Sequence, residues 1–441
     1  MTPPNGRDGR RARHTVAVIG AGYVGLPTAA TLAHFGHRVV LAEREASRLA
    51  TLRAGRLPIV EAGLEDLVTG AVTAGNLSFV QSAVDAVAGA EFVFLCVSTP
   101  QSSDGSADLS YVEAAAKEIA THLVPGAIVV NKSTVPVGSA TMVEQVIGRP
   151  DISVVSNPEF LREGTAVMDS LHPDRIVVGA DDTQAAAAVG QLFASTGAPL
   201  IVTDATTSET IKYASNAFLA TKLSFVNALA GLCEEVGADA RDVLLGLGYD
   251  KRIGFEFLRP GPGWGGSCLP KDTRALLHIA GQAGYDFSLL AGAIASNDEQ
   301  LDRVVTKVET ACGGSVKGKP VAVWGLTFKA NTDDRRDSPS LQICRRLAEL
   351  GATVQAFDPT VDTTAEPADD LRGLELRGDP YDAAGGAHAV VVLTEWDEFR
   401  WLDFARVLSV MAAPNIVDAR NLLDPAAVRR MGFTYTGIGR Q

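Results

Sequence analysis

The chain has 441 residues, more than one ordinary hydrophobic core accommodates, so we expect two or three domains. Its net charge of −13 argues against nucleic acid or an anionic membrane as the main partner. No apolar run approaches the roughly 18 residues that a membrane span needs. Five widely spaced cysteines without a CxxC pair indicate reduced thiols in a cytoplasmic protein that has no metal cluster.

The N-terminal residues 1–13 are rich in arginine, with glycine and proline among them, and they contain no apolar stretch. This composition fits neither a signal peptide nor a membrane anchor. We therefore expect a disordered tail here.

The first candidate site follows this tail. Residues 14–19 form a short apolar, β-branched run, and residues 20–25 then have the spacing GxGxxG and open a helical pattern that reaches about His34. A second apolar run, residues 38–42, ends at Glu43. This order of strand, glycine turn, helix, strand and acid is the dinucleotide-binding fingerprint.

Each residue of the fingerprint has an expected role. Gly20 permits the tight turn, Gly22 lets the backbone approach a pyrophosphate at the helix N-terminus, and Gly25 lets helix and strand pack closely. Glu43 would bind the adenosine ribose hydroxyls and repel a 2′-phosphate, which favours NAD over NADP. The neighbouring Arg44 could accommodate that phosphate, and a tight turn without any ligand is the other alternative.

Two threonines lie at the ends of the next predicted strands. Residues 91–97 and 127–131 are apolar runs, and Thr99 and Thr134 follow them. Because ligands bind outside the carboxyl ends of strands in parallel sheets, both threonines are cofactor candidates. The alternative is that each is a helix cap or a turn residue. Further runs at 175–179 and 200–203 complete a predicted sheet of about eight strands.

Two carboxylates, Glu159 and Glu163, follow a strand and the pair Asn157 and Pro158. On a helical turn they would share one face, so that one could act on a water or a proton while the other lies near the cofactor. The alternative is a solvated helix start with acids favoured by the helix dipole.

From residue 207 to residue 236 the apolar spacing is helical and contains no proline. A helix of that length measures about 45 Å, so we expect a connector between domains and a dimer surface. Lys212 and Asn216 share one face of it. The lysine could extend outward to solvent, or it could point into a site and bind an oxyanion.

Residues 261–272 place Cys268 behind a glycine run and directly before a helical pattern, with Lys271 and Asp272 in its first turn. The unpaired N–H groups and the positive dipole end of a helix favour the reactive thiolate. The alternative is a glycine-rich loop that contains a buried structural cysteine.

The second half repeats the strand and helix pattern after a long predicted helix at residues 289–311. In the first turn of this series, residues 325–329 replace the GxGxxG motif. This indicates a Rossmann-type domain that has exchanged a dinucleotide for another ligand. Lys329, Arg336 and Arg420 all follow predicted strands, which favours a phosphate ligand, with a solvated surface as the alternative.

From about His14 to the C-terminus, the chain resembles the UDP-glucose/GDP-mannose dehydrogenase family. The motifs that carry the resemblance are residues 20–25, 133–138, 157–164, Lys212 with Asn216, 265–272 and 325–329. The resemblance implies an α/β protein with two Rossmann-like doubly wound domains joined by a long central helix. Members oxidise the C6 alcohol of a nucleotide sugar to a carboxylate in two NAD-dependent steps, without releasing the aldehyde.

We expect four segments. They are a disordered tail at 1–13, an NAD-binding domain at 14–205, a central helical and dimerisation region with the cysteine loop at 206–312, and a nucleotide-sugar-binding domain at 313–441.

The resemblance also implies catalytic roles. Cys268 would attack the C6 aldehyde to give a thiohemiacetal, and a second hydride loss would yield a thioester. Lys212 and Asn216 would stabilise the oxyanion, Asp272 would position a base or water, and Glu159 would act in thioester hydrolysis. Thr134 is expected to take part in catalysis as well as to contact the cofactor.

Ligand contacts are implied for the remaining motif residues, and no metal is expected. The expected cofactor contacts are Gly20, Gly22, Tyr23, Val24, Gly25, Glu43, Thr99, Thr134, Glu163, Lys329 and Arg336. The expected nucleotide-sugar contacts are Glu159, Phe160, Leu161, Lys212, Asn216, Arg252, Gly265, Lys271 and Arg420.

Within the family, Arg252 ahead of the glycine run resembles the UDP-glucose branch, where that arginine reaches the substrate of the neighbouring subunit. We therefore expect a homodimer or higher homo-oligomer. TDP-glucose or GDP-mannose are alternative substrates, since residues 258–272 also resemble GDP-mannose enzymes. A non-catalytic nucleotide-sugar sensor and a single-step alcohol dehydrogenase or epimerase are further alternatives, and Cys268 argues against both.

Overall fold

The computed structural model describes residues 12–102 and 105–440, so residues 1–11 of the predicted tail lie outside the described part. The chain forms two compact units. The first comprises residues 1–102 and 107–212, and the second comprises residues 103–106 and 213–441. The division into four segments stays a prediction.

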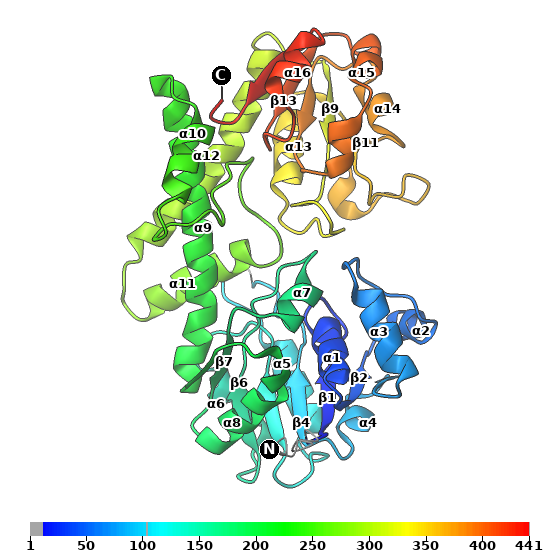
Figure 1. Cartoon of the computed structure of the whole chain (residues 1–441), viewed down its shortest axis with the longest axis vertical. Helices are drawn as coiled ribbons and strands as arrows, with labels where there is room; N and C mark the ends of the chain where they lie inside the picture. The colour runs from blue at the N-terminus through cyan, green and yellow to red at the C-terminus, as the bar shows by residue number, and fades with distance from the viewer. Residues whose placement is uncertain (1–11, 103–104, 441) are drawn as a thin grey trace, which may run out of the picture. The chain divides into compact units, whose positions relative to one another are not determined.

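The first unit is built on an eight-stranded sheet (Figure 1). Its strands are β1 (Thr15–Ile19), β2 (Arg38–Ala42), β3 (Leu77–Val80), β4 (Phe92–Leu95), β5 (Ile128–Asn131), β6 (Ser153–Ser156), β7 (Ile176–Gly179) and β8 (Leu200–Thr203). Their order is β3-β2-β1-β4-β5-β6-β7-β8, with parallel pairing throughout except between β6 and β7. The strand count agrees with the sequence-based prediction.

Helices cover both faces of this sheet, which is why its strands are almost wholly apolar. Its helices are α1 (Gly25–His34), α2 (Ala46–Arg53), α3 (Leu64–Thr73), α4 (Ala83–Val87), α5 (Ser110–Ile119), α6 (Ser139–Ile147), α7 (Ala166–Leu171) and α8 (Thr183–Leu192), with a 3-10 turn at Ala194–Thr196. One core lies between the sheet and α1, α3, α7 and α8, and the other lies under α4, α5 and α6.

The strand register brings the candidate residues of the first unit to one edge. Ile19 pairs with Ala42 and with Leu95, so β1, β2 and β4 end at the same level. Asn131, the last residue of β5, lies between Leu95 and Ser156. The turns after these five strands carry Gly20, Glu43, Thr99, Thr134 and Glu159.

Helix α9 (Ala205–Val236) begins in the first unit and continues into the second, as the helical pattern at 207–236 predicts. By length and composition it could cross a membrane, but core helices of soluble proteins pass the same test. Its buried face carries polar side chains that have protein partners, including Glu209, Lys212 and Asn216. This pattern is that of a core helix.

The second unit joins a helical part to a six-stranded parallel sheet of order β11-β10-β9-β12-β13-β14. The strands are β9 (Pro320–Trp324), β10 (Thr353–Phe357), β11 (Glu375–Leu376), β12 (Val390–Val392), β13 (Asn415–Asp418) and β14 (Thr434–Gly437). The helices are α10 (Ala240–Gly248), α11 (Leu269–Gln282), α12 (Ser288–Ala311), α13 (Pro339–Glu349), α14 (Pro380–Ala384), α15 (Phe404–Val410) and α16 (Pro425–Arg430). Short 3-10 helices lie at Asp369–Leu371 and Asp397–Trp401.

Two cores flank this second sheet. One is shared with α9, α10, α12 and α13, and the other lies under α14, α15 and α16. Figure 1 shows α9, α10 and α12 side by side. The two sheets, which are parallel except between β6 and β7, and the long helix confirm the expected α/β class with two Rossmann-like folds.

The first turn of the second sheet differs from a dinucleotide-binding turn. The carboxylate of Asp358, just after β10, accepts hydrogen bonds from the backbone N–H of Leu326 at 2.7 Å and of Thr327 at 3.2 Å. The indole N–H of Trp396 donates to the same oxygen at 3.2 Å. A protein carboxylate thus occupies the amides that would otherwise be available to a phosphate.

Candidate active site

The glycine turn after β1 has the geometry that its sequence predicts. Gly20 has a φ of +102°, which L side chains rarely adopt. A Cβ at Gly25 would clash with the Gly20 carbonyl, so Gly25 serves the packing of α1 against the turn. A Cβ at Gly22 would meet no protein atom within 4 Å. The turn therefore leaves space beside Gly22 for a close ligand, as a bound pyrophosphate requires.

Glu43 lies at the end of β2 with its side chain largely buried. Its carboxylate accepts a hydrogen bond from the Glu45 N–H at 2.9 Å, and Arg48 Nε lies 3.7 Å from its other oxygen. Arg48 also donates to the carbonyl of Ala21 in the glycine turn at 3.1 Å. Arg48, which sequence reasoning missed, thus links the acid to the glycine turn. Among the described residues no cluster of side chains could hold a metal.

The two threonines predicted at the cofactor edge lie together. Thr99 Oγ1 donates to the carbonyl oxygen of Thr134 at 2.9 Å, which joins the turns after β4 and β5.

The loop that carries Thr134 ends at α6. There, Glu209 of α9 accepts hydrogen bonds from the N–H groups of Gly138 at 2.7 Å and Ala140 at 2.9 Å. Burial raises the Glu209 pKa to about 7 despite these two bonds.

Glu159 and Lys212 form a buried ion pair at 2.8 Å within the first unit. Burial acts to raise the Glu159 pKa, but the charge and hydrogen bond of Lys212, the Leu161 N–H and the charge of Lys132 outweigh it, so the pKa is lowered. The carboxylate is therefore held ionised. Of the two alternatives for Lys212, the structure selects the inward orientation.

The predicted helical turn at residues 157–164 is wrong. The segment has no helix, and α7 begins only at Ala166. The Leu161 N–H donates to the Glu159 carboxylate at 2.5 Å, and this local bond takes the place of a helical one. Glu159 and Glu163 therefore do not share a helical face. The Phe160 ring beside Glu159 is covered by the Arg175 guanidinium at 3.7 Å.

Sequence reasoning also missed Lys132, which follows β5 directly and is buried. Its Nζ donates to Asn157 Oδ1 at 3.0 Å. A lysine inside the otherwise buried run between β5 and Thr134 was the available signal, because lysine is rarely buried without a reason.

Cys268 lies in the second unit, directly before α11, and its side chain is partly exposed. Ser267 Oγ lies 3.5 Å from its sulfur. The preceding loop is fixed by Trp264, which is buried and donates from its indole N–H to Ser224 Oγ of α9 at 2.9 Å. The other four cysteines are buried, whereas this one is placed at a helix start, as the sequence predicts.

One turn into α11, Asp272 is fully buried between two partners. Asn216 of α9 donates from Nδ2 to its carboxylate at 2.6 Å, and Lys271 pairs with its other oxygen. The Asp272 N–H in turn bonds the Cys268 carbonyl at 2.9 Å. Asn216, Asp272 and Lys271 are thus held within one turn of the cysteine.

The glycine run is tightly packed against the second Rossmann-like fold of the same unit. A Cβ at Gly265 would clash with the Asp337 carbonyl, and one at Gly266 would lie 2.8 Å from the Phe328 ring. These glycines allow the loop to approach residues 326–338.

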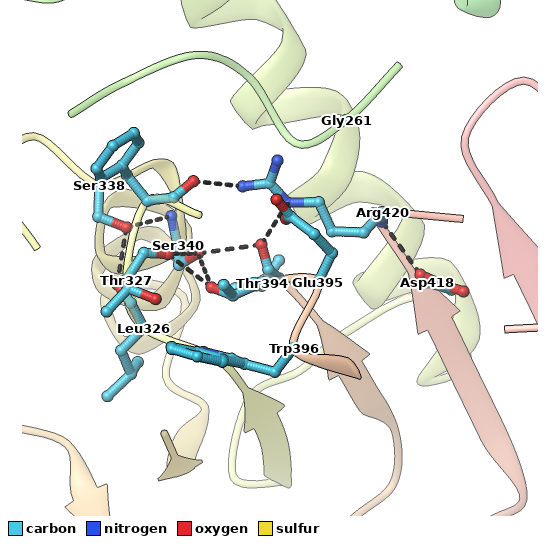
Figure 2. Close-up of polar contacts among 12 residues, drawn as sticks. Gly261, Leu326, Thr327, Ser338, Ser340, Thr394, Glu395, Trp396, Asp418 and Arg420 are labelled. Atoms are coloured by element: carbon cyan, nitrogen blue, oxygen red, sulfur yellow. Dashed lines mark hydrogen bonds and ion pairs between the residues drawn. The ribbon is translucent and has the colours of Figure 1, made fainter. Parts of the chain in front are cut away.

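Arg420 lies at the same edge of the second sheet, just after β13 (Figure 2). Its guanidinium donates to the carbonyls of Leu393 at 2.8 Å and Phe328 at 2.7 Å and pairs with Glu395 at 3.0 Å. Figure 2 places it beside the backbone at Gly261. The other predicted cations lie in the loop after β9: Lys329 Nζ is 5.4 Å from the Phe328 ring, and Arg336 pairs with Asp334.

The predicted residues thus divide between the units. Those of the glycine turn, the two threonines, Glu159 and Lys212 belong to the first, and Asn216, Cys268, Asp272 and Arg420 belong to the second. Helix α9 carries Lys212 and Asn216 four residues apart, hence on one helical face. Arg252, also in the second unit, has an 88% exposed side chain that pairs with Asp250 at 2.6 Å.

Comparisons with known proteins identify the family. Family models match residues 14–196 (NAD binding domain), 206–299 (central domain) and 322–425 (UDP binding domain) of the UDP-glucose/GDP-mannose dehydrogenase family. The UDP-glucose 6-dehydrogenase of Rhizobium meliloti is 46% identical over 96% of this chain and 99% of its own, and that of Pseudomonas aeruginosa is 44% identical over 96% and 97%.

A solved structure gives the same result. The UDP-glucose dehydrogenase of Pyrobaculum islandicum is 37% identical, covers 98% of this chain and 99% of its own, and has a TM-score of 0.89. The cofactor is accordingly NAD. The chain is an NAD-dependent nucleotide-sugar dehydrogenase that belongs to the UDP-glucose/GDP-mannose dehydrogenase family.

Proposed function

We propose that the protein oxidises the C6 alcohol of UDP-glucose to the carboxylate of UDP-glucuronate, with Cys268 as the covalent nucleophile. The observation that carries the chemistry is the position of Cys268, partly exposed directly before α11 and one turn from the buried pair of Asn216 and Asp272. The preference for UDP-glucose rests on relatives of that name at 43–46% identity over nearly the full length.

The proposed reaction begins with loss of a hydride and a proton from the C6 alcohol, which gives an aldehyde. The Cys268 thiol adds across the aldehyde C=O, its sulfur to the carbon and its proton to the oxygen, and gives a thiohemiacetal. The thiohemiacetal loses a second hydride and its hydroxyl proton to become a thioester. Water then cleaves the C–S bond, which releases the carboxylate and restores the cysteine. NAD supplies the two hydride acceptors when bound. The covalent bond explains why the aldehyde need not leave the enzyme.

Other side chains of the two units have distinct proposed roles. Lys212 and the Asn216 amide are hydrogen-bond donors that stabilise the oxyanion of each tetrahedral species. Asp272 orients Asn216 and Lys271. Glu159, held ionised by Lys212, accepts a proton from the hydrolytic water. Thr134, whose carbonyl accepts a hydrogen bond from Thr99, is proposed to act beside the cofactor.

NAD has suitable groups in the first unit. The turn at residues 20–25 and the N-terminus of α1 suit its pyrophosphate, with Tyr23 and Val24 in that turn, and Glu43 suits the adenosine ribose. Glu163, Lys329 and Arg336 remain proposed cofactor contacts. Phe160, Leu161, Gly265, Lys271 and Arg420 are proposed contacts of the nucleotide sugar, and Arg252 is proposed to reach the substrate of a second subunit.

The deciding experiment counts the NADH formed per UDP-glucose consumed, with TDP-glucose and GDP-mannose in parallel. We expect about two NADH per UDP-glucose and little turnover of the other two nucleotides. Cys268→Ser should bind UDP-glucose and form no carboxylate, whereas Cys233→Ser, a buried cysteine of the same unit, should remain active. A ratio near one NADH per UDP-glucose would contradict the covalent mechanism, which requires two oxidations. Absence of turnover with all three nucleotide sugars would favour a nucleotide-sugar sensor.

We also propose that the protein is a homodimer that pairs through α9. Phe218, Phe225 and Leu232 are spaced by seven residues along one face of this helix and are 69%, 60% and 55% exposed. Phe225→Glu should therefore give monomers in sedimentation velocity, whereas Trp401→Glu, at an exposed aromatic outside α9, should not change the mass.

No disulfide joins any of the five cysteines, all of which lie in the described part of the chain, and this supports a cytoplasmic location.

A further inference from the structure

Lys132 has no role in the reaction proposed above, yet it is 9% exposed and lies directly after β5 at the cofactor edge of the sheet. Its ammonium donates to Asn157 Oδ1 at 3.0 Å. Asn157 donates from Nδ2 to the Val177 carbonyl of β7 at 2.7 Å. Lys132 therefore ties the end of β5 to the residue two positions before Glu159, and Asn157 ties that residue to the neighbouring strand.

The charge of Lys132 calls for a separate explanation. Its hydrogen-bond partner is a neutral amide, and the Phe193 ring lies 5.4 Å from the ammonium. Burial is the main cause that lowers its pKa to about 8, so the ammonium is kept at a cost. A neutral donor could hold Asn157 equally well. A nearby anion favours the charged form of a buried lysine.

Glu159 is that anion. Cys96, directly after β4, also faces Lys132, but burial raises its pKa to about 12 and the thiol stays neutral. Glu159 forms a direct ion pair with Lys212, and the positive charge of Lys132 also stabilises its ionised form. The first unit therefore surrounds one buried carboxylate with two buried cations that come from different elements.

We propose that Lys132 is a positioning residue of the active site, which holds the segment that carries Glu159 through Asn157 and keeps Glu159 ionised for thioester hydrolysis. This inference rests on the proposed function. In that step, water adds to the thioester carbonyl, the C–S bond breaks and one water proton passes to Glu159. That proton then goes to the departing sulfur of Cys268, and the product acid loses the other proton to solvent. No further redox partner is needed.

The pH dependence follows from the groups that face Glu159. These are Lys212 on α9, Lys132 after β5, the neutral Cys96 after β4 and, stacked on the adjacent Phe160 ring, Arg175. Hydrolysis requires an ionised Glu159 and declines as pH falls through its pKa. Loss of Lys132 removes a charge that lowers this pKa, so the acid limb of activity moves to higher pH.

Three variants of the full-length protein separate the two roles. Lys132→Gln can keep the hydrogen bond to Asn157 and loses the charge. Lys132→Met loses both, and Asn157→Ala keeps the charge and loses the bond. Lys117→Met removes an exposed lysine on α5 of the same unit and serves as the control. Glu159→Gln is the reference for impaired hydrolysis. Each is assayed with UDP-glucose and NAD by stopped flow and at steady state.

We expect both Lys132 variants to retain a rapid burst of about two NADH per subunit, because the two oxidations precede hydrolysis. Their steady-state rate should fall about tenfold to a hundredfold, with the acid limb at higher pH. Asn157→Ala should lower the rate with no movement of that limb, and Lys117→Met should behave as the wild type.

Other outcomes would overturn the proposal. If the Lys132 variants lose rate without a burst and in step with a lower Tm, Lys132 is structural. An unmoved acid limb in Lys132→Gln excludes the electrostatic role, and this variant decides the matter if Lys132→Met does not fold. If Glu159→Gln itself turns over normally, the proposed role of Glu159 has failed and this inference fails with it. A burst in Glu159→Gln with wild-type behaviour of the Lys132 variants refutes this inference alone.

Discussion

The Asn216 amide on α9 donates to the Asp272 carboxylate on α11 at 2.6 Å, so one buried hydrogen bond joins the central helix to the turn that follows Cys268. Asp272 also pairs with Lys271. Its carboxylate has the two acceptor oxygens that both donors require.

Asp272→Asn should therefore impair catalysis more than folding. The amide introduced by this substitution would present an N–H₂ group toward one of the two donors, which misorients Asn216 or Lys271. We expect kcat to fall by about a hundredfold or more, the loss typical of one misplaced oxyanion donor. The measurement is kcat together with Tm. Asp286→Asn, at an exposed position after α11, should change neither.

Two glycines of the first turn should respond differently to alanine. A Cβ at Gly22 meets no protein atom, whereas one at Gly25 clashes with the Gly20 carbonyl. Gly22→Ala should keep the wild-type Tm and weaken NAD binding, because the added methyl occupies the ligand side. Gly25→Ala should lower the Tm by several degrees, as about 1–3 kcal/mol of overpacking requires. Calorimetric titration with NAD and thermal melts distinguish the two, and equal NAD affinity in Gly22→Ala would contradict the ligand assignment.

Glu43 should set the choice between NAD and NADP. Its carboxylate lies after β2, where it would bind ribose hydroxyls and repel a 2′-phosphate. We expect Glu43→Ala to lower the ratio of kcat/KM for NAD over that for NADP. The matched control is Glu65→Ala, an exposed acid on α3. An unchanged ratio would mean that another residue makes the ribose contact.

Glu209 should make the stability of the protein depend on pH. Its pKa is raised from 4.5 to about 7 by burial, so the folded state retains a proton that the unfolded state has released. The stabilisation from this group is full below about pH 4.5 and is lost as pH rises through about 7.

The test is the free energy of unfolding by denaturant across this pH range. Glu209→Gln cannot titrate, so its stability should decline less than that of the wild type as pH increases. The difference between the two curves isolates Glu209 from the other titrating groups. Parallel curves would show that the carboxylate is ionised throughout, held by the N–H groups of Gly138 and Ala140.

Much of the fold followed from local sequence patterns. The glycine turn, the helix at 207–236 and the second Rossmann-like series each have a periodicity or spacing that belongs to one structure. Residues 157–164 lack such a pattern. There the Leu161 N–H donates to the Glu159 side chain, and this bond competes with helix formation. Hydrophobic periodicity carries no information about a single bond of this kind. The fold was therefore most predictable where many residues repeat one signal.

The candidate site was predictable where a motif gathers its residues in sequence, as around Cys268. It was not predictable where the partners come from elements far apart in the chain. Lys132 reaches Asn157, 25 residues on, and Glu209 reaches Gly138, 71 residues back. Such pairs depend on strand order, which a single sequence does not state. Trp264 is a further example, because it lies in a loop and its indole partner Ser224 lies on α9, 40 residues earlier in the chain.

Asp358 has a consequence for how each half of the molecule responds to ligand. In the second Rossmann-like fold its carboxylate already satisfies the amides of Leu326 and Thr327, so this turn is complete before any nucleotide arrives. The glycine turn of the first unit instead leaves its space to the cofactor. Saturation with NAD should therefore slow hydrogen exchange at residues 20–25 by mass action, while the amides of Leu326 and Thr327 are protected with or without it.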